Sequence, residues 1–149
     1  MDLNFDLERF IREKVTKREC SLLAEDFAKY DAELHERIDG KRVLVIGGAG
    51  SIGSHYIKAI LQRFAVEKLV VVDSSENGLT ELVRDLRSAG EYKIPKKFIS
   101  YPVNFGDRVF SKIFKAHGPF DIVANFAAHK HVRSEKDVFS IEAMIENNV

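Results

Sequence analysis

The sequence contains very little cysteine and no excess of charge of either sign. Its single cysteine, Cys20, excludes an internal disulfide and suits a reducing cytoplasm. The simplest interpretation of this residue is a small, half-buried hydrophobic side chain. The 23 lysines and arginines are balanced by 23 aspartates and glutamates. Because no basic stretch is interleaved with aromatic residues either, we do not expect a nucleic-acid partner.

Long hydrophobic runs are also absent. No apolar stretch approaches the ~20 residues that a membrane-spanning helix needs. The charged N-terminus lacks the apolar core of a signal peptide. We therefore expect a soluble, cytoplasmic protein without a membrane partner. The 149 residues are enough for one domain with a substantial core.

What the sequence does contain is a short apolar strand that leads into a glycine-rich turn and then into a helix, over residues 42–54. In this pattern Gly47 permits the tight turn out of the strand. Gly50 leaves room for a pyrophosphate to approach the backbone, and Gly53 lets the helix pack close to the strand. Strand, turn and helix in this order predict a dinucleotide-binding site.

The residues around this turn specify the ligand further. The helix that begins near Ser51 directs its free N–H groups and positive dipole end, at Ser51 and Ile52, toward the phosphates. Asp73 follows a second apolar run, 69–72, and its carboxylate can accept hydrogen bonds from ribose hydroxyls and repel a 2′-phosphate. Neither Ser74 nor the next three residues are basic, which favours NAD over NADP. The competing interpretation is that Asp73 only caps the next helix.

From residue 41 onward, apolar strands alternate with amphipathic helices, and the strands are predicted at 43–46, 69–72, 98–103 and 122–126. Continuously apolar strands are covered on both faces and are therefore parallel. Right-handed crossovers then give the order 3-2-1-4, an α/β, Rossmann-type doubly wound sheet. The later helices are expected to bury apolar side chains, among them Ile52, Val109, Phe110, Ile113, Phe114, Val138, Ile141 and Ile145.

Residues at the ends of these helices give boundary signals. Asp107 is placed to cap one helix, and Gly90 and Gly118 are placed to end two others. His117 lies in a last helical turn, which favours a cation.

Residues 1–40 form a separate N-terminal extension, and residues 41–149 form the nucleotide-binding domain. Two apolar faces at helical spacing, over 7–15 and 23–38, predict two amphipathic helices in the extension. We expect them to pack on the following domain. A dimerisation arm and a membrane-surface helix are the alternatives, although the mixed charges of the polar faces argue against the membrane.

Three stretches resemble the extended short-chain dehydrogenase/reductase family, in particular its nucleotide-sugar 4,6-dehydratases and epimerases of polysaccharide biosynthesis. These stretches are the glycine turn at 47–54, Val-Asn-Phe-Gly-Asp at 103–107 and Asn-Phe-Ala-Ala-His-Lys-His-Val at 125–132. The resemblance implies an NAD-dependent enzyme that oxidises a UDP-sugar transiently at C4. It also implies that Asn104, where the family has an acid, contacts adenine.

The third stretch carries two further assignments. Ala127 and Ala128 lie at the carboxyl end of the fourth strand and leave space for the ribose on the nicotinamide side, unless they only pack the strand end. The resemblance places Lys130 beside the nucleotide-sugar substrate, whereas the alternative is a solvated loop lysine. His129 and His131 lack the further ligands that a metal site needs, so we expect no metal.

The family's catalytic Tyr-x-x-x-Lys or Met-x-x-x-Lys pair is not found here in a usable form. Tyr92 and Lys96 have the spacing, but Pro95 breaks the helix that would align them. No catalytic residue is therefore assigned. We expect the chain to be the inactive, cofactor-binding part of a larger enzyme that forms homo-oligomers. A stand-alone NAD(H)-binding regulatory module, acting on a partner through the N-terminal helices, is the alternative.

Overall fold

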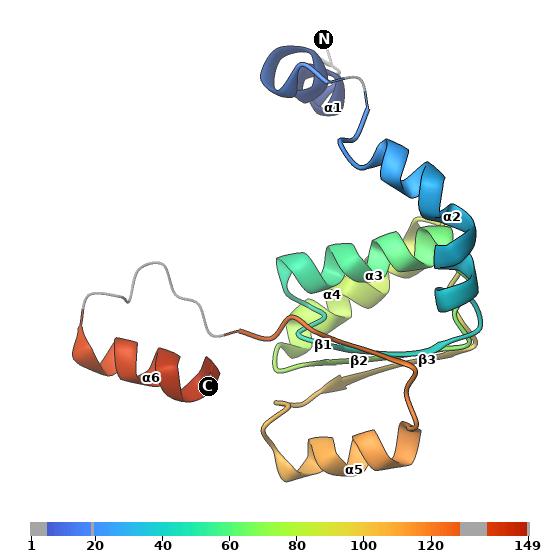
Figure 1. Cartoon of the computed structure of the whole chain (residues 1–149). Coiled ribbons are helices and arrows are strands. Elements are labelled where there is room, and N and C mark those ends of the chain that lie inside the picture. Colours follow the sequence, from blue (N-terminus) through green and yellow to red (C-terminus); the bar gives the residue numbers. More distant parts are fainter. Residues whose placement is uncertain (1–5, 19, 129–136, 149) are drawn as a thin grey trace. The chain divides into compact units, whose positions relative to one another are not determined.

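The computed structural model describes residues 6–18, 20–128 and 137–148, and the chain divides into two compact units, Met1–Glu36 and Arg37–Val149. The helices α1 (Leu7–Phe10), η1 (Ile11–Thr16) and α2 (Ala24–Ile38) confirm the helical N-terminal segments (Figure 1). Cys20 is exposed, so its interpretation as a half-buried side chain was wrong. The functional division at residue 40 stays a prediction.

The second unit is built on four parallel strands, β1 (Arg42–Ile46), β2 (Lys68–Asp73), β3 (Lys97–Pro102) and β4 (Ile122–Asn125). Their order across the sheet is β3-β2-β1-β4, which confirms the predicted Rossmann-type topology. Valine, leucine and isoleucine fill β1 and β2 because both strands are buried on both faces. In register, Ile46 lies beside Val72 and Asn125, so the strands end at a common edge.

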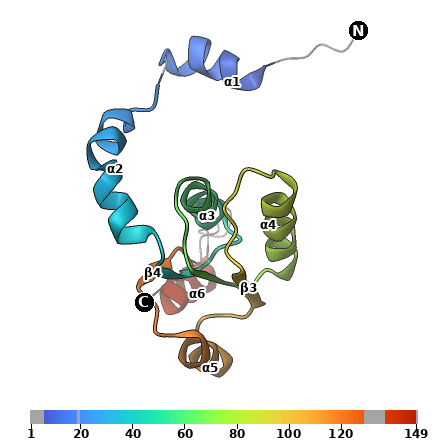
Figure 2. The ribbon, with the colours of Figure 1, turned by 90° about the vertical axis from the view of Figure 1, so that its right-hand side faces the viewer.

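Helices cover both faces of this sheet (Figures 1 and 2). α3 (Ser51–Arg63) and α4 (Glu76–Ser88) lie on one face, and α5 (Arg108–His117) lies on the other. On the α5 face, Ile113 joins a buried cluster with alternate strand residues, namely Leu44, Ile46, Val70 and Val72. The last described helix of the chain is α6 (Val138–Asn148).

Several helix boundaries agree with the sequence signals. Gly90 has φ +68° just beyond the end of α4, and Gly118 follows the end of α5. Asp107 is the N-cap of α5, but its side chain makes no capping hydrogen bond, so that part of the prediction was wrong. The segment between α4 and β3, which holds Tyr92 and Lys96, is not helical, as Pro95 indicated.

Some apolar helical positions are not buried as expected. Ile52, in the first turn of α3, is 72% exposed, and Val109 and Phe114 are 50% and 42% exposed. A short helix on a sheet covers it with one narrow stripe, which in α5 is Phe110 and Ile113. The α6 residues expected to be buried are also exposed, namely Val138, Ile141 and Ile145.

His117 also differs from expectation. Burial, and then the charge of Lys68, lower the pKa of His117 below its usual 6.5, which favours the neutral ring rather than a cation. Its Nε2 lies 2.7 Å from the hydroxyl oxygen of Tyr101. None of the helices among the described residues is long and apolar enough to cross a membrane.

Candidate functional site

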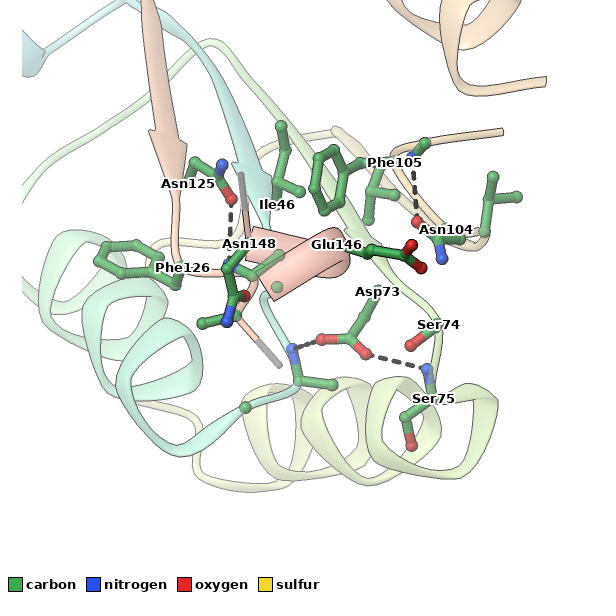
Figure 3. A pocket seen from close by; sticks show the side chains of 18 residues that line it. Ile46, Asp73, Ser74, Ser75, Asn104, Phe105, Asn125, Phe126, Glu146 and Asn148 are labelled. Carbon is green, nitrogen blue, oxygen red and sulfur yellow. Dashed lines mark hydrogen bonds between the residues drawn. The ribbon is translucent and has the colours of Figure 1, made fainter. Parts of the chain in front are cut away.

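A cavity of about 730 Å³ opens at the carboxyl ends of the strands (Figure 3). Because parallel strands end at the same edge of a sheet, residues far apart in the sequence meet there. The lining comes from the ends of β1, β2 and β4, the loop after β3, and α6: Ile46, Gly47, Ala49, Gly50, Val72, Asp73, Ser74, Ser75, Val103, Asn104, Phe105, Gly106, Asn125, Phe126, Ala127, Ala128, Glu146 and Asn148.

Gly47 makes the sharp exit from β1 that the sequence predicted. Its φ is +74°, a conformation that favours glycine. A Cβ at this position would lie 2.5 Å from the backbone nitrogen of Ala127. The amide of Gly47 donates to the carbonyl of Val72 at 2.8 Å. The turn is therefore held between the ends of β2 and β4.

Gly53 is required by a different contact from the one predicted. A Cβ there would collide with the carbonyl oxygen of Gly47 and would lie 2.9 Å from the Cα of Gly48. The close approach is therefore between α3 and the turn itself, rather than between α3 and the strand. Gly48 is constrained by side chains instead, because a Cβ there would collide with Cγ1 of Val71.

Gly50 contrasts with these glycines, because the protein leaves open space beside it. A Cβ would meet only the carbonyl oxygen of Gly47, at an ordinary 3.5 Å. Gly50 is also the N-cap of α3, and it supplies no side-chain capping bond. The N–H groups of Ser51, Ile52 and Gly53 lie in the first turn of α3, and such groups have no hydrogen-bond acceptor within the helix. Packing therefore does not require glycine here, but a ligand that approaches this helix end would.

Asp73 joins two segments that line the cavity, the glycine turn and the start of α4 (Figure 3). Its Oδ2 accepts a hydrogen bond from the amide of Ala49, and its Oδ1 accepts one from the amide of Ser75, each at 2.9 Å. The N-cap of α4 is Ser75, whose Oγ accepts from the amide of Gly78 at 3.1 Å. The interpretation of Asp73 as a cap was therefore wrong. Each carboxylate oxygen keeps capacity for a further donor.

Asn104 lines the cavity from the loop after β3. Its Oδ1 accepts a hydrogen bond from the amide of Gly106 at 2.9 Å. Its amide NH₂ group remains a donor, and its oxygen has a second lone pair. The side chain is therefore held in place while both of its functional ends can still serve a planar ring with donor and acceptor groups.

Ala127 and Ala128 line the cavity on the opposite side, after β4. The amide of Ala127 donates to Oδ1 of Asn125 at 3.0 Å, so the residue that ends β4 holds this segment (Figure 3). Lys130, with His129 and His131, lies outside the described residues. Within the described part of the chain, no three His, Cys, Asp or Glu side chains are grouped so that they could hold a metal ion.

The structure thus brings most of the predicted cofactor residues to one cavity. Gly47, Gly50, Asp73, Ser74, Asn104, Ala127 and Ala128 line it, and Ser51, Ile52 and Gly53 form the adjoining helical turn. Among the described residues that line it, none is lysine or arginine. Sequence reasoning missed other lining residues, although their positions at or just beyond the ends of predicted strands could have indicated them: Ala49, Ser75, Phe105, Asn125 and Phe126.

A strong ion pair lies at the other end of the strands. The guanidinium of Arg42 donates to both carboxylate oxygens of Asp121, at 3.0 and 3.1 Å, and the amide of Arg42 adds a third bond at 2.9 Å. These bonds lower the pKa of Asp121 to about 2. Arg42 begins β1 and Asp121 precedes β4, so this pair is remote from the cavity.

The strand order and the cavity at the strand ends define a Rossmann-like protein. Residues 43–149 match the family described as "Polysaccharide biosynthesis protein". The chain belongs to this family of nucleotide-sugar epimerases and dehydratases related to the short-chain dehydrogenases.

Two curated relatives illustrate the family. The chain is 30% identical over 119 residues to EpsC of Bacillus subtilis (strain 168), described as a probable polysaccharide biosynthesis protein; the match covers 79% of this chain and 19% of EpsC. It is 35% identical over 91 residues to the UDP-glucose 4-epimerase of Streptococcus mutans, covering 60% of this chain and 24% of that protein. The matched region is therefore a quarter or less of each relative's length.

Solved structures agree with the fold. A UDP-N-acetylglucosamine 4-epimerase from Methanobrevibacter ruminantium M1, in complex with UDP-N-acetylmuramic acid, has a TM-score of 0.51 at 23% identity and covers 75% of this chain and 31% of that one. A proposed D-mannonate oxidoreductase from Haemophilus influenza with bound NAD has a TM-score of 0.51 at 16% identity, with coverages of 72% and 43%. At these identities the similarity shows the fold alone.

Proposed function

We propose that this chain is the NAD-binding part of a nucleotide-sugar 4,6-dehydratase or epimerase that acts on a UDP-sugar through transient oxidation at C4. The observation that carries the proposal is the open space at Gly50, in front of an uncapped helix end and beside the carboxylate of Asp73. Family membership supports the enzyme class. The similarity to the UDP-glucose 4-epimerase of S. mutans supports the choice of a UDP-sugar.

The residues present fit NAD along the length of the cavity. The first turn of α3 and the backbone at Gly50 would bind the pyrophosphate, since N–H groups at a helix start bind anions. Asp73 would accept from the ribose hydroxyls, with Ser74 beside it, and Asn104 would contact adenine. Ala127 and Ala128 would border the nicotinamide side. A carboxylate at the ribose and the lack of lysine or arginine among the described lining residues favour NAD over NADP.

Bound NAD supplies a reversible hydride acceptor for the oxidation at C4. The described part of this chain contributes binding and orientation rather than proton transfer. Tyr92 and Lys96 lie in a non-helical segment, and neither lines the cavity. We therefore propose that residues 1–149 alone do not turn over a UDP-sugar. Lys130 remains the proposed substrate contact, and homo-oligomerisation and the cytoplasmic location remain predictions.

The second candidate function, an NAD(H)-binding regulatory module, rests on the first unit. Leu7, Phe10, Ile11 and Val15 are 59%, 44%, 41% and 64% exposed there, which leaves an apolar surface for a partner protein. The coding sequence beyond Val149 separates the two functions. A Tyr-x-x-x-Lys or Met-x-x-x-Lys helix would support the enzyme, and a stop codon would support the module.

The proposal is tested by titrating the purified chain with NAD⁺ and NADP⁺ in a calorimeter and by incubating it with UDP-sugars and NAD⁺. We expect NAD⁺ to bind more tightly than NADP⁺, and we expect no 4-keto product. Equal affinity for the two cofactors would contradict the assignment of Asp73. A 4-keto product would show that residues 1–149 include an acid–base pair, against the proposal that they do not turn over a UDP-sugar alone.

A further inference from the structure

The glycine turn and the first turn of α4 approach each other at Ala49 and Gly78. A Cβ built on Gly78 would lie only 2.9 Å from the Cβ of Ala49, a distance that real Cβ atoms essentially never show. It would also lie 3.0 Å from Oγ of Ser75. Glycine weakens a helix relative to alanine, so its presence at the third position of α4 needs a structural reason.

The contact with Ser75 does not supply that reason. Ser75 is the N-cap of α4 and accepts from the amide of Gly78 at 3.1 Å. Serine N-caps are commonly followed three residues later by glutamate or glutamine, whose Cβ atoms are accommodated in the same geometry. The unusual neighbour is Ala49, which comes from a different segment. Gly78 is therefore required because α4 lies directly against the glycine turn.

Asp73 ties the same two segments together. Its carboxylate binds the amide of Ala49 in the turn and the amide of Ser75 at the start of α4, both at 2.9 Å (Figure 3). All three residues line the cavity. The Ala49–Gly78 approach thus lies beside the bridge made by Asp73, and both set the separation between turn and helix. A side chain at residue 78 must therefore push either α4 or the glycine turn away. Either movement strains the two hydrogen bonds that Asp73 accepts.

We propose that Gly78 is a positioning residue for the adenosine end of the dinucleotide site. Its lack of a side chain lets α4 close against Ala49, and this closure holds the Asp73 carboxylate between two amides with its remaining lone pairs available to the cavity. Gly78 itself does not line the cavity, so its effect on the ligand passes through Ala49 and Asp73. The inference rests on the proposed function.

The test compares Gly78→Ala, Ala49→Gly and the double variant with the parent chain. Gly78→Ala should lower NAD⁺ affinity about tenfold, because an overpacked contact must be relieved by moving the turn. Ala49→Gly removes the obstructing methyl group, so the double variant should bind within about twofold of Ala49→Gly alone. Asn77→Ala, an exposed substitution in the same helical turn, is the matched control and should bind like the parent chain.

A second readout needs no ligand. Amide hydrogen exchange at residue 49 reports the hydrogen bond to Asp73. This exchange should be faster in Gly78→Ala than in the parent chain, and the double variant should exchange more slowly than Gly78→Ala. Parent-like affinity and exchange in Gly78→Ala would overturn the inference. So would a loss of affinity that Ala49→Gly does not restore. If the parent chain fails to bind NAD⁺, the proposed function fails, and the exchange at residue 49 still decides whether Gly78 positions the turn.

Discussion

The amide of Ala49 donates to the carboxylate of Asp73 at 2.9 Å, across 24 positions of sequence. This bond joins the glycine turn after β1 to the end of β2. The residue expected to select the cofactor therefore also holds the loop expected to bind its phosphates. Changes at Asp73 should accordingly have two effects, one on overall affinity and one on the choice between NAD and NADP.

The ratio of the two affinities separates these effects. In Asp73→Ala the loosened turn should weaken both cofactors, whereas loss of the carboxylate should reduce the preference for NAD⁺ at least about tenfold. Calorimetric titrations with each cofactor measure the ratio. Glu76→Ala removes an exposed acid from the start of α4 and should leave the ratio unchanged. An unchanged ratio in Asp73→Ala would mean that another group selects the cofactor.

The Arg42–Asp121 pair predicts a specific loss of stability in acid. The pKa of Asp121 is lowered from 3.8 to about 2 by its bonds to Arg42, so the folded chain binds this proton less readily than the unfolded chain. The stabilisation is complete above about pH 4 and is lost as the pH falls toward 2. Between pH 5 and pH 3, the melting temperature of Asp121→Asn should therefore fall by less than that of the parent chain.

Arg42→Gln removes the cause of that pKa shift and should flatten the same part of the profile. Thermal melting followed by circular dichroism at closely spaced pH values measures both variants. A parent-like acid profile in both would show that other carboxylates control the acid transition.

The edge strand β4 predicts self-association of the purified chain. β4 pairs with β1 alone among the described strands, and Val123 on β4 is 50% exposed. Open strand edges pair with other copies, and an edge lysine opposes this. We expect a dimer or larger species in light scattering over a concentration series, shifted toward monomer in Val123→Lys. Val109→Lys is the matched control, because Val109 is also 50% exposed but lies on α5.

A chain that stays monomeric at every concentration would contradict this prediction. It would show that the β4 edge is covered from within the chain.

The sheet could be predicted because its signal is local. β1 and β2 are uninterrupted apolar runs, and such runs are buried on both faces whatever packs against them. The burial of helix faces depends on what a helix covers, and the sequence does not contain that information locally. Val109 and Phe114 were therefore expected to be buried but are half exposed, whereas Ile113, on the same helix, is 7% exposed.

The candidate site, too, could be predicted from the sequence only in part. The roles proposed for Gly47 and Asp73 come from their positions within one pattern of strand, glycine turn, helix and strand at residues 42–73. Gly48 and Gly78 are constrained by Val71 and Ala49, which lie more than twenty positions away and meet them only in the folded chain. Short patterns find ligand-binding positions, but they do not find the packing that holds those positions.

The most direct test of the central claim is a calorimetric titration of NAD⁺ into the parent chain, Gly50→Val and Gly53→Ala, with melting curves for each. Valine at Gly50 meets little protein, so the chain should melt within a few degrees of the parent but lose roughly a hundredfold or more in NAD⁺ affinity. Alanine at Gly53 collides with the turn and should lower the melting temperature markedly. Normal NAD⁺ binding by a folded Gly50→Val chain would contradict the account, because the phosphates would then have to bind elsewhere.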